Sequence, residues 1–220
     1  MNFWQSKYKE EGFYWTLNPA PGLKRALPYA PQKGVALDIG AGEGRNSIFL
    51  AKNGFHVVAI DKIPEGLKKL ENFAEKQDLS IETLALDIEK FSFPPQKYSL
   101  VLSVAALDFM RFSNFRNIIK KIENSLISQG VVYLSVFSVD DPFFTKLNKK
   151  QFKTEEKNTF YLPKLKAYRH FFEKEELEEV FKNFKIEHIE EKKFKDVWHG
   201  DPHFHHTIEL IAKKRSGTSS

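Results

Sequence analysis

The sequence predicts an α/β protein in which one mostly parallel sheet is covered by helices on both faces. Three observations support this prediction. Short apolar runs alternate with segments of helical periodicity, and a glycine-rich loop joins the first apolar run to a helix. The last two apolar runs leave no room for a helix between them, so they should form an antiparallel hairpin. The 220 residues are enough for one such domain with a sizeable core.

Each predicted strand is a short, largely apolar run. The run at 98–104 is apolar almost throughout, which suits a parallel strand buried on both faces. Gly130 precedes the fifth strand, and Gly54 is placed to close the helix after the first strand as its C′ residue. The predicted strands are 35–39, 56–60, 81–86, 98–104, 131–137, 185–192 and 207–212.

Apolar residues at helical spacing predict the helices between these strands. The first helix follows the glycine loop at 47–53, and the second, at 64–77, begins with Pro64. The third begins after Ser113, a suitable N-cap. The inner faces of this helix and of a later one carry Phe115, Ile118, Ile119, Ile122 and Leu126, and Leu177, Val180, Phe181 and Phe184.

The loop after the first strand indicates which ligand the site takes. Gly40, Gly42 and Gly44 give the spacing G-x-G-x-G, whereas a dinucleotide fingerprint would place its third glycine at Arg45. Asp38 would gain nothing from a diphosphate but suits the positive amino group of S-adenosylmethionine, which has no phosphate. These residues resemble the first motif of the class I S-adenosylmethionine-dependent methyltransferases, an acidic residue followed by G-x-G-x-G. An ordinary strand–turn–helix with flexible glycines is the alternative.

The resemblance implies a seven-stranded Rossmann-like, doubly wound sheet, mostly parallel with an antiparallel seventh strand, and S-adenosyl-L-methionine as cofactor. Asp61 ends the second strand, at the distance where a carboxylate takes the ribose hydroxyls, although it also suits a helix cap. By resemblance, Asp87 accepts from the adenine amino group and Ile88 offers its backbone N–H; a plain turn is the alternative. The predicted cofactor site further includes Gly40, Ala41, Gly42, Lys62 and Val104.

The N-terminal segment 1–31 is predicted to cover the cofactor. Its pattern Trp4-Gln5-Ser6-Lys7-Tyr8, followed by Tyr14-Trp15 and Asn18-Pro19, resembles that of the tellurite-resistance-type and thiol-type small-molecule methyltransferases. The resemblance implies that Trp4 and Tyr8 pack near the methionine portion and that Lys7 meets its carboxylate. It also implies that Arg45 or Asn46 contacts that carboxylate or the backbone nearby. The alternative is an amphipathic helix that buries its aromatic residues in the core.

Two further segments are expected at the same edge of the sheet. The connection 138–172 is long and weakly patterned but rich in aromatic residues, so we expect a lid that shapes the acceptor pocket. The hairpin tip 196–206 carries His203 and His205 on one strand face, and these are candidate bases together with Asp108 after the fourth strand. A plain surface turn is the alternative for the tip. No metal is predicted, because His206 does not share the face of the other two histidines.

The predicted reaction is in-line transfer of a methyl group to a small-molecule acceptor. The chain lacks the Asn-Pro-Pro-Tyr sequence that amino-group nucleic-acid methyltransferases use after the fourth strand. It has no cysteine, which excludes disulfides, cysteine-ligated zinc and a covalent thiol mechanism. The net charge of +5 leaves RNA or a protein as an alternative acceptor, although basic and acidic residues are interleaved. A non-catalytic S-adenosylmethionine-binding protein is a further alternative.

A single methyltransferase domain is expected over 1–214, followed by a disordered tail at 215–220. The sequence contains no apolar stretch near 18 residues and no evident secretory signal, so a cytoplasmic protein is expected. The sequence does not indicate an oligomeric state.

Overall fold

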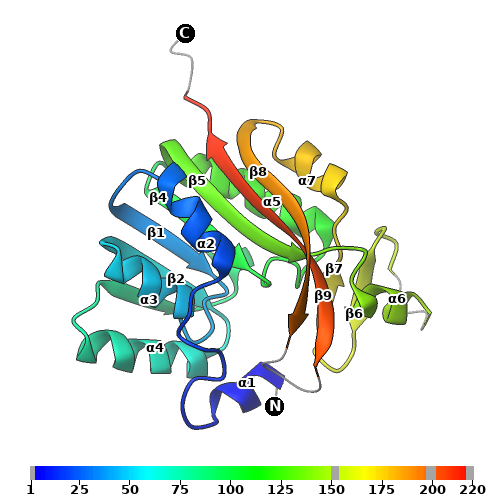
Figure 1. Cartoon of the computed structure of the whole chain (residues 1–220), viewed down its shortest axis with the longest axis horizontal. Coiled ribbons are helices and arrows are strands. Elements are labelled where there is room, and N and C mark those ends of the chain that lie inside the picture. The colour runs from blue at the N-terminus through cyan, green and yellow to red at the C-terminus, as the bar shows by residue number, and fades with distance from the viewer. Residues whose placement is uncertain (1–2, 150–153, 197–201, 217–220) are drawn as a thin grey trace.

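The computed structural model describes residues 3–149, 154–196 and 202–216. The chain folds around a seven-stranded sheet of order β3-β2-β1-β4-β5-β9-β8 (Figure 1). The strands from β3 to β5 run parallel, and β9 is antiparallel to both of its neighbours, β5 and β8. The predicted sheet is therefore confirmed. The strands are β1 (Gly34–Ile39), β2 (Phe55–Asp61), β3 (Ile81–Ala85), β4 (Tyr98–Val104), β5 (Leu126–Phe137), β8 (Phe184–Asp196) and β9 (His203–Lys214).

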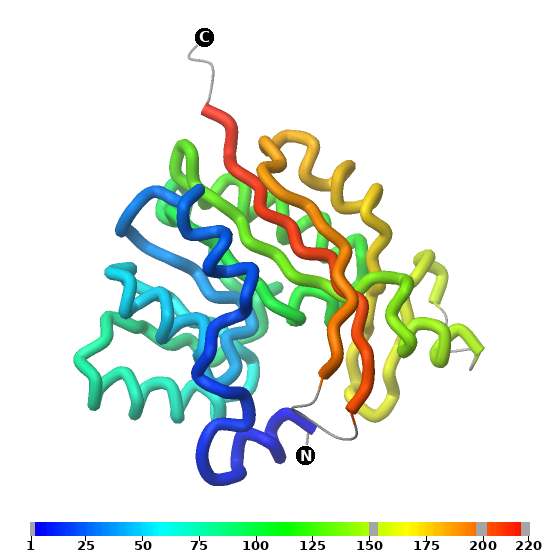
Figure 2. Tube along the Cα trace, viewed as in Figure 1, coloured from blue at the N-terminus to red at the C-terminus, as the bar shows by residue number. Residues whose placement is uncertain are grey.

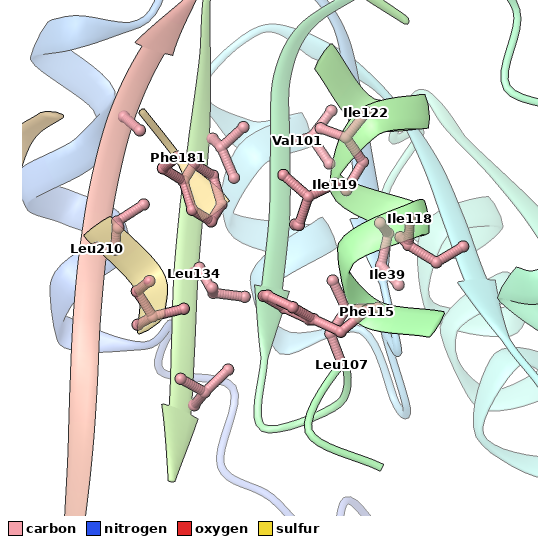
Figure 3. Close-up of a cluster of buried hydrophobic side chains, with 14 of the residues drawn as sticks. Ile39, Val101, Leu107, Phe115, Ile118, Ile119, Ile122, Leu134, Phe181 and Leu210 are labelled. Carbon is pink, nitrogen blue, oxygen red and sulfur yellow. The ribbon is translucent and has the colours of Figure 1, made fainter. Parts of the chain in front are cut away.

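Helices cover both faces of the sheet, as a doubly wound fold requires. On one face, Phe115 and Ile119 of α5 pack against the sheet in the same cluster as Phe181, directly after α7 (Figure 3). On the other face, α2 and α3 bury Leu23 and Leu50. The helices are α1 (Phe3–Tyr8), α2 (Pro21–Ala26), α3 (Arg45–Lys52), α4 (Pro64–Lys76), α5 (Phe112–Ser125), α6 (Pro142–Asn148) and α7 (Lys174–Val180), with short 3-10 helices η1 (Leu27–Tyr29) and η2 (Ile88–Lys90).

Two helices start elsewhere than predicted. Helix α3 begins at Arg45, directly after Gly44, whose φ of 83° ends the loop. The prediction that Ser113 caps α5 is wrong, because the helix already begins at Phe112. The carboxylate of Glu156 accepts hydrogen bonds from the backbone N–H groups of Phe112 (2.8 Å) and Ser113 (3.4 Å). The Glu156 side chain, distant in sequence, thus accepts hydrogen bonds from two of the backbone N–H groups that have no partner within the first turn of a helix.

The connection 138–172 is more ordered than its weak pattern suggested. It contains α6 and two short antiparallel strands, β6 (Thr159–Leu162) and β7 (Ala167–His170), which form a separate two-stranded sheet. Leu147, Phe160 and Phe171 form a small hydrophobic cluster inside it. The bridge between Ser138 and Phe172 ties its two ends together at the rim of the main sheet. Packing between apolar side chains stabilises this segment, although its weak sequence pattern did not predict these elements.

The C-terminal hairpin is longer than predicted. Strands β8 and β9 stay in register out to the pair Asp196 and His203, and positions 197–201 of the tip lie outside the described residues. In Figure 2 the hairpin end runs beyond the carboxyl end of β5, toward the N-terminal segment. Of the expected tail, Ser216 is described and its hydroxyl accepts a hydrogen bond from Gln129 (2.7 Å), whereas 217–220 lie outside the described residues.

No helix within the described ranges is long and apolar enough to cross a bilayer.

A buried carboxylate joins the end of β1 to the helix that follows it. Asp38 is 1 % exposed, and its Oδ2 accepts a hydrogen bond of 2.6 Å from the Ser47 hydroxyl of α3. Burial raises the pKa of Asp38 to about 6, although the Ser47 bond opposes the shift. The folded protein therefore holds a proton near pH 5 that the unfolded chain, with a pKa near 3.8, has released.

This difference makes Asp38 a measurable source of pH-dependent stability. Because the folded-state pKa is raised, the contribution of Asp38 is fully present below about pH 4 and is lost as the pH rises through about 6. We expect the unfolding free energy of Asp38→Asn, minus that of the wild type, to increase by up to about 3 kcal/mol between pH 4 and pH 7. Urea titrations of both ligand-free proteins measure it; a difference that stays constant with pH would contradict the assignment.

Candidate functional site

A cavity of about 580 Å³ lies at the carboxyl ends of β1, β2 and β4. Small-molecule sites typically measure about 300–1,000 Å³. The strand order changes direction between β1 and β4, and open α/β sheets bind their ligands at such a point. The N-terminal segment, the connection 138–172 and the C-terminal hairpin all contribute to its wall. The predicted cofactor residues in this wall are Trp4, Tyr8, Gly40, Ala41, Gly42, Arg45, Asn46, Asp61, Lys62, Asp87, Ile88 and Val104.

The glycine loop brings its backbone close to neighbouring elements. A Cβ at Gly40 would lie 2.2 Å from Cβ of Ala106, and one at Gly44 would lie 2.3 Å from Cδ1 of Leu70. Both glycines have positive φ, 74° and 83°, which only glycine adopts readily. The loop therefore passes between the end of β4 and helix α4. Gly40 and Gly44 are required both because a Cβ would clash with these neighbours and because their φ angles are positive.

Asp61 connects this loop to the end of β2. Its Oδ2 accepts a hydrogen bond from the Gly42 N–H (2.9 Å), and its Oδ1 accepts one from the Ile63 N–H (2.8 Å). Burial raises the pKa of Asp61, and these backbone donors oppose the increase. Each carboxylate oxygen can accept a second hydrogen bond. Asp61 thus lines the cavity with both oxygens already oriented.

Asp38 is the exception among the predicted cofactor residues. It is not in the cavity wall but lies beneath the loop, where the Ser47 hydroxyl binds it. A direct contact with a ligand amino group is therefore not what this geometry provides. Asp87 does line the cavity, and one of its oxygens accepts from the Glu89 N–H (3.0 Å) as in an ordinary turn.

The N-terminal segment covers the cavity with stacked aromatic rings. Trp4 stacks on Tyr8 with ring centroids 6.0 Å apart and lies 6.1 Å from Trp15. A Cβ at Gly42 would lie 2.7 Å from the Tyr8 hydroxyl, so this ring rests directly on the glycine loop. Tyr8 is buried, as expected for a helix that buries its aromatic residues, and it also lines the cavity, as expected for a cover of the cofactor. Lys7 instead forms an ion pair with Glu10 (2.9 Å) and is not in the cavity wall, so a contact with the cofactor carboxylate is not supported.

Side chains from the loop and the start of α3 hold this segment in place. The buried Asn46 accepts a hydrogen bond from the Ala20 N–H (2.9 Å). The buried Glu43 accepts from the Trp15 N–H (3.1 Å) and pairs with Lys69 (2.7 Å). Arg45 lies over the Trp15 ring at 5.4 Å, and burial lowers its pKa. Asn46, predicted to contact the cofactor region, is thus mainly an anchor for the segment above it, and Glu43 is an anchor that the sequence analysis missed.

Asp108 does not reach the cavity. Its side chain is fully buried, and its Oδ2 lies 2.9 Å from Nη2 of Arg169 on β7. Burial raises its pKa, and the Arg169 guanidinium opposes that shift. The prediction of Asp108 as a general base is not supported, because no face of its carboxylate lines the cavity. Its partner Arg169 does line the cavity, held between the rings of Phe109 (4.5 Å) and Phe137 (4.1 Å).

One face of the C-terminal hairpin forms the opposite wall. Alternate residues of β8 and β9 point the same way, and those on this face line the cavity: Lys192, Phe194, Asp196, His205, Thr207 and Glu209. The candidate base His205 is among them, whereas His203, on the same face of β9, is not in the wall; the two Nε2 atoms are 2.9 Å apart. His205 Nδ1 lies 2.9 Å from Oδ2 of the buried Asp141.

Several polar wall residues gave no signal in the sequence. Tyr133 lies within the apolar run of β5, and its hydroxyl donates to Glu209 of β9 (3.3 Å). Arg169 lies in the connection whose pattern was too weak to predict a strand. Whether the side chain of a strand residue faces the cavity or the core depends on the register of that strand in the sheet. This register is set by pairing with strands that are distant in the sequence.

The cavity therefore has two chemically distinct ends. The end at the glycine loop offers backbone groups and the carboxylates of Asp61 and Asp87. The other end offers the guanidinium of Arg169, the carboxylate of Asp196 and an imidazole, set among aromatic rings. Such an arrangement can hold two ligands at once, with their reacting atoms between the two ends.

Solved structures share this fold. A methyltransferase of Methanosarcina mazei, described as S-adenosylmethionine-dependent, superposes with a TM-score of 0.71 at 22% identity over 90% of this chain and 99% of that one. TehB from Haemophilus influenzae gives a TM-score of 0.70 at 19% identity over 97% of this chain and 66% of that one. A Burkholderia thailandensis N1-methyltransferase, solved with 1,6-didemethyltoxoflavin and S-adenosylhomocysteine, gives 0.65 at 18% identity over 89% of this chain and 77% of that one. At these identities the likeness shows the fold alone.

Curated relatives match a shorter stretch. The probable S-adenosyl-L-methionine-dependent methyltransferase TehB of Haemophilus influenzae is 28% identical over 106 residues, 48% of this chain and 37% of that protein. An uncharacterized methyltransferase of Bacillus subtilis, YodH, is 29% identical over 92 residues, 42% of this chain and 39% of that protein. The matches span well under half the length of these relatives. The family model described as tellurite resistance protein TehB matches residues 26–185, from η1 through β7 to the start of β8, and the chain therefore belongs to the TehB family.

Proposed function

We propose that the protein binds S-adenosylmethionine at the glycine-loop end of the cavity and transfers its methyl group to a small-molecule acceptor at the other end. The observation that carries this proposal is Asp61, a partly buried carboxylate that both lines the cavity and holds the glycine loop through the Gly42 N–H. Membership of the TehB family and the fold shared with S-adenosylmethionine-dependent methyltransferases support the same ligand.

The wall residues provide complementary groups for each part of the cofactor. Asp61 accepts from the two ribose hydroxyls, for which its oxygens each keep a second acceptor site. Asp87 and Ile88 lie at the next strand end, where the adenine ring fits. Trp4 and Tyr8 cover the methionine portion, and the half-buried Arg45, a cation of the cavity wall, pairs with the cofactor carboxylate.

The proposed chemistry is a single displacement. A lone pair of the acceptor atom forms a bond to the methyl carbon, the carbon–sulfur bond breaks, and the sulfonium sulfur keeps that electron pair as a neutral thioether. The methyl group is already activated, so the protein chiefly positions the two reactants in line, which is worth an effective concentration of about 10⁵–10⁸ M. A thiolate or other anionic acceptor needs no base, and a neutral acceptor passes its proton to His205 or water.

The acceptor end supports a small, polar molecule. Arg169 lines the cavity and its side chain is 11% exposed, so its guanidinium group is within reach of an acceptor oxygen. The aromatic rings of Phe109 and Phe137 exclude water around the guanidinium, which strengthens its attraction for a negative charge. Described residues of the N-terminal segment, of β7 and of the C-terminal hairpin all line the cavity, whose volume of about 580 Å³ suits small molecules.

Removing the carboxylate of Asp61 tests the cofactor site. We expect Asp61→Ala to weaken binding of S-adenosylmethionine and S-adenosylhomocysteine by about 100-fold or more, because two hydrogen bonds to a charged group are lost. Isothermal titration calorimetry measures the affinities. The control is Glu82→Gln, a carboxylate near the start of β3 that lies outside the cavity wall. Equal affinities of the Asp61 variant and the wild type, with unchanged circular dichroism, would contradict the proposal.

A labelled-methyl assay tests the class of acceptor. The protein is incubated with methyl-labelled S-adenosylmethionine and, separately, thiols, metalloid oxyanions, amines, phenols and bulk RNA. We expect label in a small acceptor and none in RNA. Transfer to RNA, with an affinity that falls steeply with salt, would instead favour a nucleic-acid substrate. Binding of cofactor without transfer to any acceptor would favour a sensor.

Arg169→Lys tests the acceptor end separately from the cofactor end. Lysine keeps the charge beside Asp108 but loses the planar fork that bonds an oxyanion. We expect KM for an anionic acceptor to rise about tenfold or more, through one lost charge-assisted hydrogen bond, with affinity for S-adenosylhomocysteine unchanged. An unchanged KM would show that Arg169 does not bind the acceptor.

A further inference from the structure

Three potential metal ligands meet on the cavity face of the C-terminal hairpin. His203 and His205 alternate along β9, and Asp196 of β8 stands opposite His203 in the register. One ligand atom from each side chain lies within 4.8 Å of the other two. The two Nε2 atoms are 2.9 Å apart, and Oδ2 of Asp196 is 4.0 Å from Nε2 of His205. Two imidazoles and one carboxylate therefore converge from two strands.

The carboxylate of Asp141 determines which ring nitrogen of His205 carries the proton. Oδ2 of Asp141 lies 2.9 Å from His205 Nδ1 and also accepts from the His206 N–H (3.0 Å), while its Oδ1 accepts from the Phe143 N–H (2.8 Å). The Asp141 carboxylate accepts a hydrogen bond from the Nδ1–H of His205, which leaves the lone pair on Nε2. A carboxylate behind an imidazole is the arrangement that orients histidine ligands in metal sites.

We propose that Asp196, His203 and His205 bind one divalent transition-metal ion of the Zn²⁺ type at the rim of the cavity. Zn²⁺ binds imidazole nitrogen and carboxylate oxygen at about 2.0–2.2 Å, so its ligand atoms lie roughly 3–3.5 Å apart. The nitrogen pair already has nearly this spacing, and a small rotation of the Asp196 carboxylate brings the third ligand in. In this state His203 also presents its Nε2 lone pair, with its proton on Nδ1.

The ligand set indicates the class of metal. Mg²⁺ and Ca²⁺ prefer sites built from oxygen, whereas imidazole suits Zn²⁺ and its neighbours in the first transition row. Three protein ligands leave at least one coordination position open, as in catalytic zinc sites. Asp196 and His205 both line the cavity, so the open position faces the acceptor end rather than bulk solvent.

A role in the reaction follows, and this part of the inference rests on the proposed function. A thiol or hydroxyl that binds the open position loses its proton more readily, because the ion stabilises the anion. The proton would pass to water, and the acceptor anion would then form its bond to the methyl carbon as described above. Methyl transfer would then proceed without Asp108 as a base, which accords with the burial of that carboxylate away from the cavity.

Metal binding is measured on the full chain, stripped with a chelator and then titrated with Zn²⁺ in competition with a chromophoric chelator. We expect one ion per chain. Asp196→Asn and His203→Gln should each weaken the binding at least tenfold, and Asp141→Asn about tenfold through the orientation of His205. His206→Gln is the matched control, because His206 is adjacent in sequence but alternation places it on the other face of β9; its affinity should equal that of the wild type.

A second measurement keeps the test independent of the variants. Co²⁺ added to the stripped wild type should give the visible absorption of a four- or five-coordinate site, and Zn²⁺ should abolish it. The proposal is overturned if Zn²⁺ fails to bind with one-to-one stoichiometry, or if Asp196→Asn and His203→Gln bind it as the wild type does. The pair is then a simple hydrogen bond in which His203 donates to His205.

Affinity for S-adenosylhomocysteine, measured in the same samples, separates the two proposals. Cofactor binding without metal binding overturns only the metal site, and metal binding without cofactor binding overturns only the proposed function and the role derived from it.

Discussion

The partly buried carboxylate of Asp61 is the contact on which the rest of the site depends. It joins the loop after β1 to the start of α4 through two backbone N–H groups, Gly42 and Ile63. Removing a carboxylate from water is costly, and these donors offset that cost. The loop, the strand end and the first turn of α4 are consequently held as one unit. This unit determines the shape of the cavity at the glycine-loop end.

The N-terminal cover is built on the same unit. Glu43, between the last two glycines of the loop, and Asn46, in the first turn of α3, accept backbone hydrogen bonds from Trp15 and Ala20. Lys69 of α4 adds bonds to backbone oxygens of the cover, at Glu10 (2.8 Å) and Gly12 (2.6 Å). The cover is thus fastened by polar contacts to the loop it encloses.

The acceptor end is assembled differently, from segments that are distant in sequence. Arg169 comes from the small second sheet, and its charge is balanced by Asp108 after β4. The opposite wall is one face of β8 and β9. A fold shared across many proteins can therefore keep one ligand end constant while these later segments change the other. Function in this fold depends on the site rather than on the scaffold.

Much of the scaffold was predictable from local patterns. The apolar runs predicted the strands of the main sheet, and the spacing of Gly40, Gly42 and Gly44 predicted the loop. Local patterns failed where a distant group replaced a local one. Ser113 was expected to cap α5, but Glu156 from the connection does so. Lys7 was expected at the cofactor but pairs with Glu10, because an ion pair within one helical turn is close at hand.

The sequence by itself determined the fold class, the position of the glycine loop and the acids that follow the strands, because these depend on short-range periodicity and on residue types that few conformations accept. Only the tertiary structure decided which acids reach the cavity. Asp38 and Asp108, like Asp61, are acids at or after the end of a strand, yet both are buried and neither lines the cavity. Sheet register and the packing of α3 and β7 set the direction of their side chains. The pairing of Asp196 with His203 likewise required the hairpin register, which brings together side chains that the linear sequence keeps apart.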